Sequence, residues 1–130
     1  MRSIKITGNG YHPFILFDIE KGIVQITGNC CGHDAHSHFR PLLSTLRKSG
    51  SITSKIHVQL FLSRVNLVSG SELIRVLKEF RKHQKSGTEL SIIWYYEDEE
   101  QLELGQNLAE LVGLGMVFKS LARQFYSSTA

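Results

Sequence analysis

One short segment of the sequence gathers most of the side chains that could carry out metal or thiol chemistry. Residues 30–38 read Cys-Cys-Gly-His-Asp-Ala-His-Ser-His. Zinc prefers thiolate and imidazole ligands, so this segment could hold a metal ion. The candidate ligands are Cys30, His33, His36 and His38. Their spacing matches no common structural zinc site, and the alternative is a polar loop in which Asp34 or Ser37 caps the following helix.

The sequence contains no complete catalytic constellation. A thiolate beside an imidazole is a nucleophile, but no third residue can be assigned to orient a Cys–His pair within residues 30–38. The glycines are scattered, and the phosphate-binding pattern G-x-x-x-x-G-K-[ST] does not occur. The acidic residues at 97–100 are typical of a solvated helix start. We therefore expect a protein that is not an enzyme and has no cofactor.

Two serines in the middle of the chain have either a structural or a regulatory role. Residues 69–72 fit the S-x-x-E capping box, in which the serine oxygen accepts a first-turn N–H and the glutamate reaches back. The alternative is that Ser69 or Ser71 accepts a phosphoryl group. A phosphate at a helix N-terminus meets unpaired N–H groups and the positive end of the helix dipole, and it presents about −2 of charge to a partner.

The pattern of apolar residues predicts the elements that position these side chains. Runs of β-branched and aromatic residues bounded by turn residues predict strands, and apolar residues at i, i+3, i+4 and i+7 predict helices. The expected strands cover residues 4–7, 14–17, 23–27, 56–62, 90–96 and 116–118. The expected helices cover residues 37–48 and 69–85 and the segment from the acidic run to Gly113. The order β-β-β-α-β-α-β-α-β indicates an α/β fold with a mixed sheet and crossover helices.

Two of these elements carry more specific expectations. Pro41 is tolerated only near the start of a helix, so the first helix is expected to begin around Ser37 or His38. A basic last turn followed by Gly50 is expected to end it. The strand at 56–62 alternates and then becomes fully apolar, which predicts burial on both faces of the sheet at its end.

Length and composition indicate one globular domain. The chain has 130 residues, of which 42% are hydrophobic and 21% are charged, and its formal net charge is +3. This surplus is far below the basicity of a dedicated nucleic-acid-binding protein. No window approaches the ~18 apolar residues of a membrane-spanning helix, no secretory signal opens the sequence, and two free thiols favour the cytoplasm. We expect the domain to span residues 1–118, and residues 119–130 to form a short helix or a loose tail.

The charged residues are unevenly distributed along the chain. Residues 69–86 carry five basic and two acidic side chains, which gives a local charge of +3. Residues 97–103 carry five acidic side chains and no basic one, which gives a local charge of −5. Solvated faces of amphipathic helices explain both segments, and the alternative for the basic helix is a contact with phosphate groups.

A longer motif resembles a known family. Residues 94–105 read Trp-Tyr-Tyr-Glu-Asp-Glu-Glu-Gln-Leu-Glu-Leu-Gly, which is similar to the W-Y-Y-acidic run followed by E-x-G in the SiaC family of bacterial regulatory phosphoproteins. Weaker matches are His12-Pro13, Ile26-Thr27-Gly28, Phe39 with Pro41, and Asn66. The resemblance covers about residues 4–118. It implies an architecture similar to STAS domains, the fold of anti-sigma-factor antagonists.

The resemblance implies a non-catalytic adaptor that works by partner switching. In the family, a kinase and a phosphatase set the phosphorylation state of a Thr or Ser at the start of the second helix. The unphosphorylated form binds and regulates a target, which in the best-known members is a diguanylate cyclase that makes cyclic di-GMP. The implied partners are therefore proteins, with no nucleic acid and no membrane insertion, and the implied role is control of biofilm or surface behaviour.

This sequence departs from the family pattern at the phosphorylated residue. The family reads N-T-S-S after the central strand, whereas residues 66–69 read Asn-Leu-Val-Ser. The phosphorylated threonine is therefore replaced by Leu67, which cannot accept phosphate. Either Ser69 or Ser71 has taken over, or phosphorylation does not switch this member. Ser69-Gly70 resembles the S-G pair at the phosphorylated helix start of STAS domains, which favours Ser69.

A second departure lies in the loop after Gly28. The family tends to have a small residue followed by Pro-Glu, and here residues 30–33 read Cys-Cys-Gly-His. This loop is expected either to recognise a different partner or to bind metal in this member. The predicted partner-binding residues are Asn66, Leu67, Ser69, Cys31 and His33.

Overall fold

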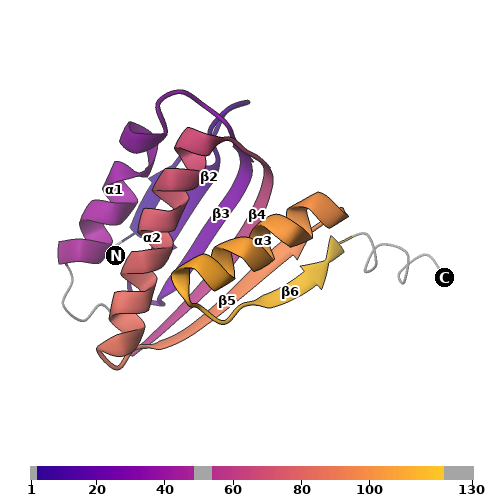
Figure 1. Ribbon diagram of the computed structural model, residues 1–130. Coiled ribbons are helices and arrows are strands. Elements are labelled where there is room, and N and C mark those ends of the chain that lie inside the picture. Colours follow the sequence, from indigo (N-terminus) through magenta and orange to yellow (C-terminus); the bar gives the residue numbers. More distant parts are fainter. Residues whose placement is uncertain (1–2, 49–53, 122–130) are drawn as a thin grey trace.

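Within residues 3–48 and 54–121, which the computed structural model describes, six strands and three helices follow one another in the predicted order (Figure 1). The strands are β1 (Ser3–Ile6), β2 (Phe14–Asp18), β3 (Ile23–Cys30), β4 (Lys55–Val65), β5 (Glu89–Tyr96) and β6 (Val117–Ser120). The helices are α1 (Ala35–Lys48), α2 (Leu67–Lys85) and α3 (Glu99–Val112).

The strands form one mixed sheet in the order β1-β2-β3-β4-β5-β6. β1, β2 and β3 pair antiparallel, whereas β3, β4, β5 and β6 pair in parallel because a helix crosses over between each of them. Ile26 in β3 lies opposite Leu60 in β4, which lies opposite Trp94 in β5. The three helices lie on the same side of the sheet (Figure 1). The predicted α/β fold with a mixed sheet and crossover helices is confirmed.

The core lies between the sheet and these helices, and β4 shows this most clearly. Ile56, Val58, Leu60 and Leu62 are buried, whereas the alternating residues His57, Gln59 and Phe61 are only partly buried. The prediction that this strand is buried on both faces at its end is wrong. The alternation continues to Leu62 because, in the described part of the chain, the helices cover one face of the sheet only.

Helix α1 begins earlier than its proline suggests. It starts at Ala35 rather than at Ser37 or His38, so Pro41 is its seventh residue. Proline leaves the carbonyl four residues earlier without its donor, and that carbonyl belongs to Ser37. Ser37 and Pro41 are both exposed, so water can satisfy it. The last turn is basic, as predicted, and the expected stop at Gly50 lies outside the described residues.

Helix α3 explains the motif that spans residues 94–105. Asp98 is its N-cap and accepts a hydrogen bond from the Gln101 amide at 2.9 Å, and Gly113 ends it with a left-handed φ of 77°. The Trp94 indole donates to the Gln101 carbonyl at 2.9 Å. A Cβ on Gly105 would lie 2.6 Å from that indole, so only glycine lets α3 approach β5 this closely. The tryptophan and the glycine therefore fix the packing of α3 on the sheet.

The last strand runs two residues past its predicted end. β6 covers Val117–Ser120, so its end crosses the expected boundary at residue 118, and residues 122–130 of the expected tail lie outside the described part of the chain. None of the helices of the described residues is long and apolar enough to cross a membrane.

Candidate functional site

The start of α2 is fixed by Asn66, which joins this helix to the end of β3. Asn66 is the N-cap: its backbone is extended, and its Oδ1 accepts a hydrogen bond from the Ser69 amide at 2.8 Å. Its Nδ2 donates to the Cys31 carbonyl at 2.9 Å, and its amide donates to the Cys30 carbonyl at 3.1 Å. Two of the predicted partner-binding residues, Asn66 and Cys31, are therefore held side by side.

The predicted capping box at residues 69–72 is wrong, because α2 begins two residues before Ser69. Ser69 is the third residue of the helix and is only 1% exposed. Its hydroxyl has no hydrogen-bond partner of standard geometry among the described residues. Glu72 does not reach back to the helix start; its Oε1 instead lies 2.5 Å from Nδ1 of His36 on α1.

The buried thiol of Cys30 lies beside the Ser69 hydroxyl. The pKa of Cys30 is raised to about 11, chiefly by burial, with the Ser69 side chain acting to lower it and Cys31 acting to raise it. The thiol therefore stays protonated near neutral pH. Cys30 is fully buried in the hydrophobic core, so its thiol is not accessible to reagents in the folded protein.

Two aliphatic side chains project from the first turn of α2. Leu67 is 89% exposed and Val68 is 54% exposed. Ser71, one turn further on, is also exposed, and its hydroxyl donates to the Leu67 carbonyl at 3.2 Å. Leu67 and Val68 are adjacent, so they form one exposed apolar patch, and such patches are candidates for contact with a partner.

A shallow hollow of about 600 Å³ lies next to this helix start. It is lined by Asn9, Tyr11, His12, Cys31, Gly32, His33 and Asp34. The Cys31 amide donates to the Tyr11 carbonyl at 2.8 Å, which holds the loop before β2 against the loop after β3. Tyr11 is 67% exposed and was missed from the sequence, where only the glycines at positions 8 and 10 marked its loop. We call Tyr11, Cys31, His33, Asn66, Leu67 and Val68 the α2-start surface.

Two histidines support the floor of this hollow. The rings of His12 and His38 stack with their centroids 4.7 Å apart, and Nε2 of His38 donates to the Pro13 carbonyl at 2.6 Å. Nδ1 of His12 is buried without a hydrogen-bond partner among the described residues. Burial, followed by the nearby His38, lowers the pKa of His12 from its usual 6.5, while Asp34 acts in the opposite direction. These surroundings thus favour the neutral form of His12.

The four candidate metal ligands are not brought together. Cys30 belongs to the core, His36 pairs with Glu72, and His38 stacks on His12. His33 alone of the four lines the hollow. In residues 3–48 and 54–121, no group of three or more His, Cys, Asp or Glu side chains is arranged to hold a metal ion.

Solved structures share this fold. SiaC of Pseudomonas aeruginosa has a TM-score of 0.82 and 17% sequence identity, over 92% of this chain and 99% of that chain. The crystal structure of the diguanylate cyclase SiaD in complex with its activator SiaC, from the same organism, gives 0.82 and 18% over 90% of this chain and 98% of that chain. A search of curated proteins found no match. At this identity, the structural similarity shows the fold alone.

A match to a protein family extends the similarity to the sequence itself. Residues 6–121 match the family described as SiaC family regulatory phosphoprotein. The match covers most of the chain, including the α2-start surface and the motif at residues 94–105. The resemblance seen in that motif is therefore confirmed, and the chain belongs to the SiaC family of regulatory phosphoproteins.

Proposed function

We propose that this chain is a non-catalytic signalling adaptor that binds and regulates a partner enzyme, a diguanylate cyclase or a similar target. Membership of a family of regulatory phosphoproteins supports this, as does the complex in which SiaC of Pseudomonas aeruginosa is bound to a diguanylate cyclase as its activator. The observation that carries the proposal is the pair of exposed aliphatic residues, Leu67 and Val68, at the start of α2.

These two side chains suit a binding anchor because their backbone is already fixed. The Asn66 cap and its bond to the Cys31 carbonyl order the first turn of α2 before any partner arrives. Ordering in advance lowers the entropy lost on binding. Burial of one exposed leucine side chain contributes roughly 1.5–3 kcal/mol. Leu67 is therefore the contact expected to contribute most to the affinity of this surface.

Loss of the anchor should weaken the complex with the cognate target. Leu67→Asp is expected to reduce the affinity at least roughly tenfold, because it places a charge where a dry contact forms. Leu111→Asp is the matched control, since Leu111 is 65% exposed but lies on α3. Isothermal titration calorimetry with the purified target measures both variants. Equal affinities for the two variants would contradict the role of the α2-start surface.

We further propose that a kinase and a phosphatase act on this chain at Ser71. Leu67 stands at the position that carries phosphate in the family and cannot accept it. Ser69 is buried against Cys30, so its hydroxyl is closed to a kinase in the folded protein. Ser71 is exposed on the same face of the helix start and touches the Leu67 carbonyl. A phosphate there would place about −2 of charge beside the anchor.

Mass spectrometry after incubation with the cognate kinase tests this assignment. Phosphate is expected on Ser71 and not on Ser69, and Ser71→Asp should weaken target binding while Ser71→Ala should not. Ser69→Asp is not a usable mimic, because it would bury an unpaired carboxylate and unfold the protein. Unmodified Ser71, or full binding by Ser71→Asp, would show that this member is not switched at this residue.

We infer a cytoplasmic location for this adaptor. Cys30 and Cys31 are both free thiols in the structure, and free thiols persist in reducing compartments. The proposed partners are proteins, with no role for nucleic acid or membrane insertion. Assay of the purified chain with the target should show that the target alone carries the catalytic activity.

A further inference from the structure

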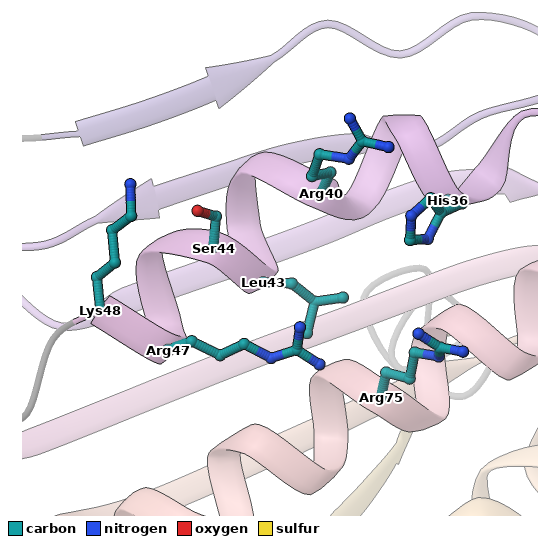
Figure 2. A pocket seen from close by; sticks show the side chains of 7 residues that line it. All are labelled: His36, Arg40, Leu43, Ser44, Arg47, Lys48 and Arg75. Atoms are coloured by element: carbon teal, nitrogen blue, oxygen red, sulfur yellow. The ribbon is translucent and has the colours of Figure 1, made fainter.

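A basic groove lies between α1 and α2, on a different part of the molecule from the α2-start surface. Its volume is about 370 Å³, and its lining residues are His36, Arg40, Leu43, Ser44, Arg47, Lys48 and Arg75. Figure 2 shows Leu43 in the middle of the groove, with Arg47 reaching in from α1 and Arg75 from α2. None of the lining residues is acidic.

Two carboxylates beneath the groove hold part of this charge in place. Arg47 pairs with the buried Glu79 at 3.1 Å, and Arg75 lies 3.7 Å from the buried Glu72, which also contacts His36. The lining has four arginine and lysine side chains, with a charge of +4, and the two carboxylates beneath it contribute −2. The local charge is therefore +2. The excess is carried by Arg40 and Lys48, which project from the side of α1 away from α2 (Figure 2) and have no ion-pair partner among the described residues. The α1 side of the groove therefore attracts an anionic surface.

A strongly acidic surface lies on α3, on the opposite flank of α2 from α1 (Figure 1). Its exposed carboxylates are Glu99, Glu100, Glu103 and Glu110. The helix contains no basic residue. Leu111 stands exposed at the end of this stripe. Because α2 separates the two flanks, α3 cannot reach the groove of its own molecule.

Helices α1 and α3 match in length and in the spacing of their exposed charges. Both α1 and α3 have 14 residues. On α1 the cations at positions 40, 47 and 48 enclose the uncharged pair 43 and 44; on α3 the anions at 99–103 and 110 enclose the uncharged pair 106 and 107. These positions are spaced by whole helical turns, so each set forms one stripe along its helix. Opposite signs therefore come into register when the two helices lie side by side.

We propose that copies of this chain associate head to tail, with α3 of one copy docked in the α1–α2 groove of the next. The contact joins two different surfaces, so it is heterologous. It rests mainly on exposed charges, which makes it weak and sensitive to salt. None of the residues of the α2-start surface lines the groove.

Sedimentation velocity of the full chain at several concentrations tests this association. At about 0.02 M salt we expect species larger than the monomer, and at about 0.5 M salt we expect the association to weaken at least tenfold, because the Debye length falls from about 20 Å to about 4 Å. A monomer at every concentration in low salt would overturn the proposal and leave the groove to an acidic segment of another protein.

Charge-neutralised variants identify the two surfaces. The groove variant is Arg40→Gln with Lys48→Gln, and the α3 variant is Glu99→Gln with Glu103→Gln. Each should be monomeric alone, whereas an equimolar mixture should form a 1:1 dimer, because the groove variant retains the acidic α3 and the α3 variant retains the basic groove.

The matched control neutralises two cations that lie away from the groove. Lys5 is on β1 and Lys21 is in the turn between β2 and β3, and both are exposed. Lys5→Gln with Lys21→Gln should associate like the original chain. Equal loss of association in this control, or no dimer in the mixture of the groove and α3 variants, would contradict the docking of α3 in the groove.

Discussion

Ser69 and Ser71 lie two residues apart on α2, and the helix turns them in different directions. A helix has 3.6 residues per turn, so residues two apart point almost to opposite sides. Ser69 faces the core beside Cys30, and Ser71 faces solvent. The same contrast separates Cys30 and Cys31 at the end of β3, where only Cys31 reaches the hollow. Neighbouring residues at this surface therefore differ in whether a reagent or an enzyme can reach their side chains.

The two adjacent thiols should react at very different rates. Cys30 is buried and its pKa is raised to about 11, so almost none of it is thiolate at about pH 8. Cys31 is partly exposed. Brief treatment of the folded protein with iodoacetamide should add one label, and peptide mass spectrometry should place it on Cys31. A second label on Cys30 under native conditions would contradict the burial of its thiol, whereas labelling of both residues in urea is the positive control.

At the scale of elements, the periodicity of apolar residues predicts which helices and strands form. Tertiary contacts decide at which residue a helix begins. The apolar patterns were sufficient for the order of strands and helices, because each pattern reflects one buried face. The start of α2 was predicted at Ser69 because serine and asparagine are equally good caps. Asn66 is the cap because its Nδ2 also bonds the Cys31 carbonyl, a contact across 35 residues that no local pattern contains.

The sequence points to only some residues of the candidate site, because others join it through contacts between segments far apart in the chain. Cys31, Asn66 and Leu67 were identified by comparison with the family pattern. Tyr11 was not, because its place beside Cys31 depends on a backbone hydrogen bond between two loops. The histidine pattern at residues 33–38 suggested a metal site, but it falls where a helix begins and turns its side chains in different directions.

Two substitutions of Asn66 separate its two roles. Asn66→Ala removes both the cap and the bond to the Cys31 carbonyl, so it should lower the free energy of unfolding by about 1–3 kcal/mol. Asn66→Asp keeps an oxygen for the Ser69 amide but has no N–H for the Cys31 carbonyl. It should therefore lower the free energy of unfolding by less than Asn66→Ala does. Urea denaturation followed by circular dichroism measures both. Equal losses would show that the cap itself contributes little.

At the scale of the whole molecule, the helices cover one face of the sheet, and within residues 3–48 and 54–121 no helix covers the other face. Every strand from β2 to β5 alternates between buried and less buried residues. Within the described residues, the large apolar residues of the core point to the helix side. Stability thus comes from a single layer of contacts, in which the loop before β2, the start of α1 and the start of α2 meet at one end.

The histidines at this end should make the stability of the molecule depend on pH. The pKa of His12 is below its usual 6.5 in the folded state, so the unfolded chain binds the proton more readily. The contribution of His12 to the free energy of unfolding is therefore complete above about pH 7. It decreases as the pH drops through 6.5 toward the lower pKa of the folded state. Urea denaturation between about pH 7.5 and about pH 5.5 measures this loss.

The matched variant for this loss is His12→Gln, which cannot titrate. Its free energy of unfolding should change less over the same pH range than that of the original chain, because the difference reports the proton on His12. His38, His33 and Asp34 face His12 and are present in both proteins. Identical pH dependence in both proteins would show that His12 is not the group responsible.

Neighbouring residues of β4 provide the most direct test of a sheet covered on one face. Leu60 is fully buried beneath the helices, so Leu60→Ala should lower the free energy of unfolding by about 2–5 kcal/mol. Phe61 is larger but points to the open face, where it is only partly buried. Phe61→Ala should therefore cost less than half as much, although it removes more atoms. If guanidinium denaturation shows equal losses, the second face of the sheet must also be covered in solution.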